Sequence, residues 1–176
     1  YKQLKDKIDN SVINVIEDAT FINGPSVKSF QKNLEDYLDI KHVIPCANGT
    51  DALQIAMMGL NLKPGDEVIT TPFTFIATTN AIIIAGATPV FVDIDPNTFL
   101  IDLKNIKDAI TDKTKMIVIN SPSNPTGAVY NREALESVRD LAVDHDITII
   151  SDEIYREIKY SQECISIGSL EGMVER

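Results

Sequence analysis

The sequence predicts an α/β fold of three layers, in which helices cover both faces of a mainly parallel sheet. Short apolar runs alternate with amphipathic segments along most of the 176 residues. Such alternation is typical of parallel strands joined by right-handed helical crossovers. Two runs, 116–119 and 147–150, are apolar enough for strands buried on both faces. A polar cluster follows each of these two runs, which places both clusters at the carboxyl edge of the sheet.

Two amphipathic helices are expected at the start of the chain. Residues 4–16 repeat apolar side chains on one helical face. A turn at 23–25 then leads to a second helix that runs to about residue 38, with Ser26 as its expected N-cap. Strand and helix alternate after this second helix.

Five short apolar runs then predict the strands, and amphipathic stretches between them predict the remaining helices. The expected strands are 42–46, 67–70, 90–93, 116–120 and 147–151. The expected helices are 51–60, 75–85, 103–110 and 131–143. No internal linker interrupts this pattern, so we expect residues 1–176 to form a single domain.

Composition excludes several classes of function. A net charge of −10 argues against nucleic acid and against anionic membranes as partners. No apolar run reaches membrane-spanning length. The two cysteines, Cys46 and Cys164, lack metal-ligand or redox spacing, which indicates no metal site and a reducing, cytoplasmic compartment.

An amide, a carboxylate and a phenol are expected to converge at the carboxyl edge of the sheet. Asn124 lies in the segment 121–127 after one buried strand, and Asp152 and Tyr155 follow another. These groups suit a planar heteroaromatic cofactor that has a ring nitrogen and a neighbouring oxygen. Here the chain resembles the fold type I pyridoxal-phosphate enzymes, aspartate-type aminotransferases in particular, which carry Asn-Pro-x-Gly followed by Asp-x-x-Tyr.

Residues 48–51 follow the first expected strand and open a helix. Free N–H groups at a helix start bind phosphate well, although a ligand-free N-cap is the common reading of such a segment. The location at the same sheet edge favours a cofactor-phosphate site at the amides of Gly49, Thr50 and Asp51.

The segment 71–78 lies after the second expected strand and offers an aromatic face from Phe73 or Phe75. Together with 48–53 and 91–96, it resembles the DegT/StrS family of nucleotide-sugar aminotransferases. In that family the second aromatic of a Pro-x-Thr-aromatic pattern stacks on the cofactor, so the resemblance implies this role for Phe75.

The resemblance also implies roles for the other residues at this edge. Asp152 would keep the pyridine nitrogen protonated, so that the ring withdraws electrons from the substrate carbanion. Tyr155 and Asn124 would hold the ring's phenolate oxygen. The alternatives from structure alone are a helix cap for Asp152 and a core aromatic for Tyr155, but the paired motifs favour the catalytic roles.

Two departures from the family pattern shape the interpretation. The DegT/StrS resemblance covers residues 1 to about 117, and the rest resembles the aspartate aminotransferase group, which suggests a chimera, a reconstructed ancestor or an unusual natural member. The chain also ends before the family's Schiff-base lysine. We therefore expect the amino-terminal portion of a large cofactor-binding domain, inactive alone, that begins inside a longer gene product.

Three functions remain open at this point. The first is amino transfer from an amino acid to a nucleotide-linked keto-sugar, with pyridoxal phosphate as cofactor and a homodimer as the family's assembly. The second is an aspartate-type amino acid aminotransferase acting on a keto acid. The third is a non-catalytic α/β scaffold or engineered subdomain, which the missing lysine favours.

Overall fold

The computed structural model describes residues 1–158, 160 and 163–173. The chain divides into two compact units, residues 1–47 (unit 1) and 48–176 (unit 2). The single-domain organisation expected from the sequence stays a prediction. In the described part of the chain, no helix is both long and apolar enough to cross a membrane.

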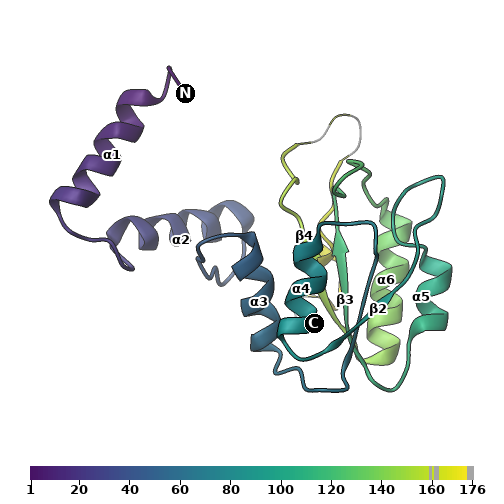
Figure 1. Cartoon of the computed structure of the whole chain (residues 1–176). Helices are drawn as coiled ribbons and strands as arrows, with labels where there is room; N and C mark the ends of the chain where they lie inside the picture. The colour runs from purple at the N-terminus through teal and green to yellow at the C-terminus, as the bar shows by residue number, and fades with distance from the viewer. Residues whose placement is uncertain (159, 161–162, 174–176) are drawn as a thin grey trace. The chain divides into compact units, whose positions relative to one another are not determined.

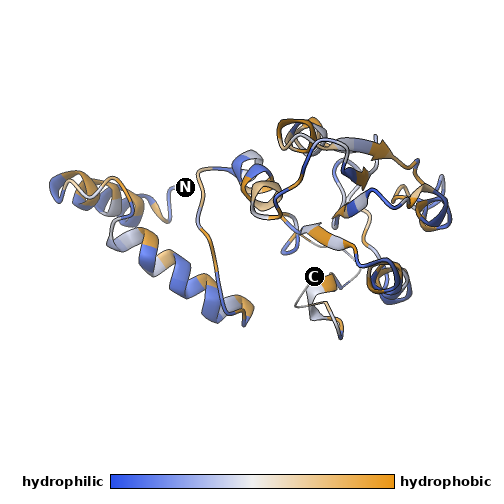
Figure 2. Ribbon diagram, turned by 90° about the horizontal axis from the view of Figure 1, so that it is seen from below, coloured by the Kyte–Doolittle hydropathy of each residue, from blue (hydrophilic) through white to orange (hydrophobic). Residues whose placement is uncertain are grey.

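Unit 1 contains the two helices predicted at the start, α1 (Lys5–Glu17) and α2 (Pro25–Leu38). The N-cap of α2 is Gly24 rather than the expected Ser26, because Pro25 occupies the first helical position, where its fixed φ suits the helix. Neither helix buries a residue. Polar and apolar residues alternate along both helices in Figure 2.

Unit 2 is built around a parallel sheet of four strands (Figure 1). The strands are β1 (Glu67–Thr70), β2 (Thr88–Phe91), β3 (Thr114–Asn120) and β4 (Thr148–Asp152). Their spatial order is β2-β1-β3-β4, so β3 lies inside the sheet and pairs with β1 and β4. The last residues of β3 and β4 are in register, Asn120 opposite Asp152.

Helices lie on both faces of this sheet, as the sequence predicts. They are α3 (Gly49–Gly59), α4 (Ile76–Ile84), α5 (Leu103–Ala109) and α6 (Arg132–His145), with a 3₁₀ turn, η1 (Ile167–Ser169), near the end. In Figure 1, α3 and α4 lie on one side of the strands and α5 and α6 on the other. The three-layer α/β fold is therefore confirmed.

The alternation of side chains along β3 explains the two cores. Ile117 and Ile119 pack with buried residues of α5, α6 and η1. Met116 and Val118 pack with buried residues of α3 and α4. A strand with apolar residues on both faces reads as a continuous apolar run, which is the pattern that predicted it.

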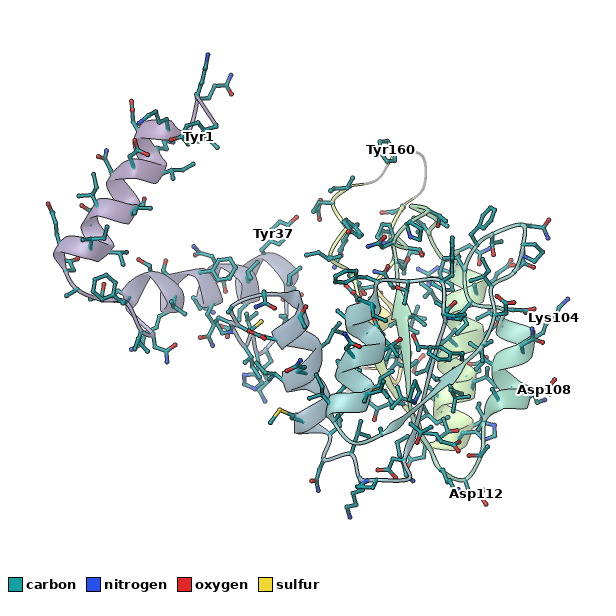
Figure 3. The ribbon with its side chains drawn as sticks, in the orientation of Figure 1. Tyr1, Tyr37, Lys104, Asp108, Asp112 and Tyr160 are labelled. Atoms are coloured by element: carbon teal, nitrogen blue, oxygen red, sulfur yellow. The ribbon has the colours of Figure 1, made fainter. Side chains whose placement is uncertain are left out.

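Helix α5 is amphipathic, with a polar outer face and an apolar inner face. Figure 3 shows Lys104 and Asp108 pointing away from the sheet, whereas Ile106 on the inner face is fully buried. Asp102 caps the helix, and its carboxylate accepts a hydrogen bond from the Lys104 N–H at 2.9 Å. The apolar spacing and the capping residue together account for this short helix.

The prediction of a strand at 42–46 is wrong, because these residues form no strand in the structure. The segment belongs to unit 1 and pairs with no strand of the described sheet, whose edges are β2 and β4. Pro45 has no N–H to donate, and the Ile44 side chain is 75% exposed. The strand predicted at 90–93 begins two residues earlier, because Pro89 is tolerated on an edge strand.

Candidate functional site

A pocket of about 540 Å³ lies at the carboxyl edge of the sheet, entirely within unit 2. We call it the sheet-edge pocket. Its walls come from the start of α3, the start of α4 and the ends of β3 and β4. It brings together six of the seven residues that the sequence singled out: Gly49, Thr50, Phe75, Asn124, Asp152 and Tyr155.

Asp152 ends β4 and is partly buried in the wall of this pocket. Burial raises the pKa of its carboxyl above the ordinary value of 3.8, a hydrogen bond from the Ile154 N–H lowers it, and the charge of Glu153 raises it. The Ile154 N–H lies 3.3 Å from Asp152 Oδ1. Because burial disfavours the charged form of the Asp152 carboxylate, a nearby cation would stabilise that charged form.

Asn124 and Tyr155 lie on the loops that leave β3 and β4, and both are partly buried. The backbone N–H of Asn124 donates to Oδ1 of Asn120 at 2.6 Å. Tyr155 lies in a turn, where its carbonyl oxygen accepts the Ile158 N–H at 2.8 Å. An amide and a phenol therefore share the pocket with the Asp152 carboxylate, as the sequence led us to expect.

The start of α3 forms one corner of the sheet-edge pocket. Asn48 caps the helix, and its Oδ1 accepts the Asp51 N–H at 3.0 Å. The Asp51 amide is therefore already used, and Asp51 does not line the pocket. Gly49 and Thr50 do line it, and first-turn N–H groups have no partner inside the helix. A Cβ built on Gly49 meets no atom within 4 Å, so the space above its backbone is open.

Of the two aromatic candidates, Phe75 lines the pocket and Phe73 does not. Phe75 occupies the N-cap position of α4, and 57% of its side chain is exposed. An exposed ring on a pocket wall is available to a flat ligand. Phe75 is therefore not a core residue in this structure.

Glu153 lies beside Asp152 and also lines the pocket, but its carboxylate has other partners. Its Oε1 accepts hydrogen bonds from the hydroxyls of Ser151 at 2.8 Å and Ser166 at 2.7 Å. Because these bonds hold the Glu153 carboxylate, Asp152 is the acid available to a ligand.

Sequence reasoning missed Asn120, whose side chain also lines the pocket wall. Its Nδ2 donates to the Asp152 carbonyl oxygen at 2.9 Å while its Oδ1 accepts from Asn124. The signal was present: a polar residue closes an apolar strand four positions before Asn124.

This donor set fits a planar cation that carries a phosphate. The pocket offers a carboxylate, an amide, a phenol and an aromatic ring, with helix-start amides at one side. Among the described residues, no group of three or more His, Cys, Asp or Glu side chains is placed to hold a metal ion. The residues present thus match an organic, phosphate-bearing group.

Comparison with known proteins agrees with this chemistry. The sequence profile of the DegT/DnrJ/EryC1/StrS aminotransferase family matches residues 2–153. The sequence suggested that the family resemblance ends near residue 117. The match instead continues past Ile117 and takes in Asn124 and Asp152.

Two relatives illustrate the range of similarity. The chain is 41% identical to UDP-2-acetamido-2-deoxy-3-oxo-D-glucuronate aminotransferase of Pseudomonas aeruginosa, over 85% of this chain and 40% of the relative. It is 43% identical to aspartate aminotransferase of Pyrococcus abyssi, over 71% of this chain and 33% of the relative. The chain thus spans less than half the length of these relatives.

Among solved structures, the chain is similar to NtdA from Bacillus subtilis, crystallised with bound cofactor PMP. The TM-score is 0.78 at 35% identity, over 86% of this chain and 34% of NtdA. The similarity therefore includes the fold as well as the sequence.

Proposed function

Because this chain belongs to the DegT/DnrJ/EryC1/StrS aminotransferase family, we propose that its sheet-edge pocket binds pyridoxal phosphate and forms part of an aminotransferase site. The observation that carries the proposal is the convergence of Gly49, Phe75, Asn124, Asp152 and Tyr155 on one pocket from segments far apart in the sequence.

Each part of the cofactor has a counterpart among these residues. The amides of Gly49 and Thr50 would hold the phosphate, and the Phe75 ring would cover one face of the pyridine. Asp152 would hold the proton of the ring nitrogen, while Asn124 and Tyr155 would bind the neighbouring oxygen. The bound cofactor supplies an electron-withdrawing ring for the transfer of an amino group.

For the substrates, we propose an amino acid donor and a nucleotide-linked keto-sugar acceptor. The family match supports this choice, as does the name of the Pseudomonas aeruginosa relative.

An aspartate-type amino acid aminotransferase is the second candidate. The 43% identity to aspartate aminotransferase of Pyrococcus abyssi favours it. We further propose a homodimer in the cytoplasm, as the family resemblance and the lack of metal-ligand or redox spacing between Cys46 and Cys164 suggest.

A binding titration tests the proposal against the scaffold alternative. Pyridoxamine phosphate, which has no aldehyde and does not react with surface lysines, would be titrated into the chain and followed by calorimetry. One saturable site, with inorganic phosphate as a weaker competitor, is expected. Heat that never saturates, or binding that phosphate does not reduce, would favour the scaffold.

Gly49→Ala tests the phosphate corner. The added methyl meets no protein atom, so the fold is expected to tolerate it, with helix stability unchanged or raised by up to about 1 kcal/mol. It would occupy the space that the phosphate needs, so we expect pyridoxamine phosphate to bind about 10-fold more weakly, the effect of losing one hydrogen bond to a charged group. Calorimetry and urea unfolding would measure the two effects.

Gly59→Ala is the matched control for this substitution. Gly59 ends the same helix, its added Cβ also meets nothing within 4 Å, and it does not line the pocket. Affinity for pyridoxamine phosphate should therefore be unchanged. If the two variants lost affinity equally, α3 would not be the phosphate site.

A further inference from the structure

The side chain of Asn120 connects the ends of two strands to the loop that carries Asn124. Its Nδ2 donates to the carbonyl oxygen of Asp152 at 2.9 Å, and its Oδ1 accepts the backbone N–H of Asn124 at 2.6 Å. Both ends of this amide are therefore used by backbone groups. The two residues that it contacts, Asp152 and Asn124, both line the sheet-edge pocket.

Only one orientation of the amide satisfies these partners. If the side chain were flipped, the NH₂ group would face the Asn124 N–H and the oxygen would face the Asp152 carbonyl, which are two repulsive pairs. The Asp152 carbonyl also accepts the Ser121 N–H at 3.0 Å. The Asn120 side chain thus continues the pairing of β3 with β4 beyond the last residue in register.

We propose that Asn120 is a positioning residue, which sets the separation between the Asn124 amide and the Asp152 carboxylate in the sheet-edge pocket. The proposal rests on the proposed function, because these two groups would hold the oxygen and the nitrogen of one rigid pyridine ring. The distance between those two ring atoms is fixed, so the ring binds well only if its two partners are held at a matching separation.

Asparagine suits this task for reasons of size and chemistry. The position needs one donor and one acceptor on a short side chain. An ionised aspartate has the acceptor but no donor, and alanine has neither. In Asn120→Ala the Asn124 N–H loses its partner, whereas the Ser121 N–H can still donate to the Asp152 carbonyl.

Amide hydrogen exchange of the ligand-free chain tests the contact itself. In Asn120→Ala, the Asn124 amide is expected to exchange at least 10-fold faster than in the wild type. Asn120→Asp keeps the acceptor, so it is expected to restore most of the protection of that amide. If exchange at Asn124 were the same in wild type and Asn120→Ala, the proposal would be overturned.

Ligand affinity tests the positioning. Asn120→Ala is expected to bind pyridoxamine phosphate about 10-fold more weakly, while its affinity for inorganic phosphate, which needs only the start of α3, stays unchanged. Faster exchange at Asn124 with undiminished affinity for pyridoxamine phosphate would overturn the positioning role. An equal loss for both ligands would indicate a general distortion and would overturn it as well.

Asn131→Ala is the control for loss of an asparagine side chain. Asn131 caps α6, where its Oδ1 accepts the Ala134 N–H at 2.8 Å, and it does not line the sheet-edge pocket. The Asn131→Ala variant should be less stable than the wild type, with unchanged Asn124 exchange and unchanged pyridoxamine phosphate binding.

If the wild-type chain binds no pyridoxamine phosphate, the proposed function fails, and with it the role of Asn120. Failure of Asn120→Ala to change exchange, with wild-type binding intact, rejects the role of Asn120 alone.

Discussion

Asp152→Asn is expected to weaken the binding of pyridoxamine phosphate roughly 10- to 100-fold, the range for losing a hydrogen bond to a charged group. Asparagine has nearly the same shape but carries no charge to balance the protonated ring nitrogen. Calorimetry on the two proteins at one pH would measure the ratio. Glu153→Gln provides the comparison, because the Glu153 carboxylate is held by Ser151 and Ser166. Equal losses in the two variants would contradict the assignment of Asp152.

The pH dependence of this ratio follows from the raised pKa of Asp152. Only the ionised carboxylate can pair with the ring cation. As the pH falls through the raised pKa, the wild-type carboxyl becomes neutral, and the affinity advantage over Asp152→Asn should shrink toward one. A ratio that stays constant from neutral to acid pH would show that the Asp152 charge has no part in binding.

The same shift predicts the stability of the ligand-free chain. Between the ordinary pKa of 3.8 and the raised value, the folded chain binds more protons at Asp152 than the unfolded chain does. The Asp152 contribution to the free energy of unfolding therefore falls as the pH rises through this window. At neutral pH Asp152→Asn removes that unfavourable contribution, so the ligand-free variant should be at least as stable as the wild type.

Ile117→Ala is expected to lower the free energy of unfolding of unit 2 by about 2–5 kcal/mol. Ile117 is fully buried in the inner strand β3, with packed residues of α5 and α6 around it. The loss is large because the net stability of a domain is only about 5–15 kcal/mol. Urea unfolding followed by tyrosine fluorescence would measure it, since Tyr130 is buried in the same core.

Lys115→Ala is the matched control on the same strand. Its side chain is exposed, so the change should stay within about 0.5 kcal/mol. If Ile117→Ala cost as little as Lys115→Ala, β3 would not be the centre of the core.

The sequence predicted the elements whose signal is local. The apolar runs at 67–70, 116–120 and 147–151 became β1, β3 and β4 within one or two residues at each end. In the sheet, β3 pairs in parallel with β4, and this carries Asn124 and Asp152 to one edge.

Features that depend on a specific partner could not be predicted. The segment 42–46 has the composition of a strand, but strand formation needs a neighbour to pair with, and composition does not reveal one. Asp51 has the expected place at a helix start, yet its N–H is taken by the Asn48 side chain. Asn120 looked like an ordinary strand end, because its two partners come from residues 124 and 152.

The absence of buried side chains in residues 1–47, all of which the structure describes, has a consequence for how the chain melts. Burial of apolar surface is what makes unfolding cooperative, and isolated helices shorter than about 12–15 residues are marginal in water. With 13 and 14 residues, α1 and α2 are near that limit. Their helical content should decline gradually on heating, while unit 2 unfolds in one sharp transition. A single Tm would therefore describe the sheet and its helices, and not the whole chain.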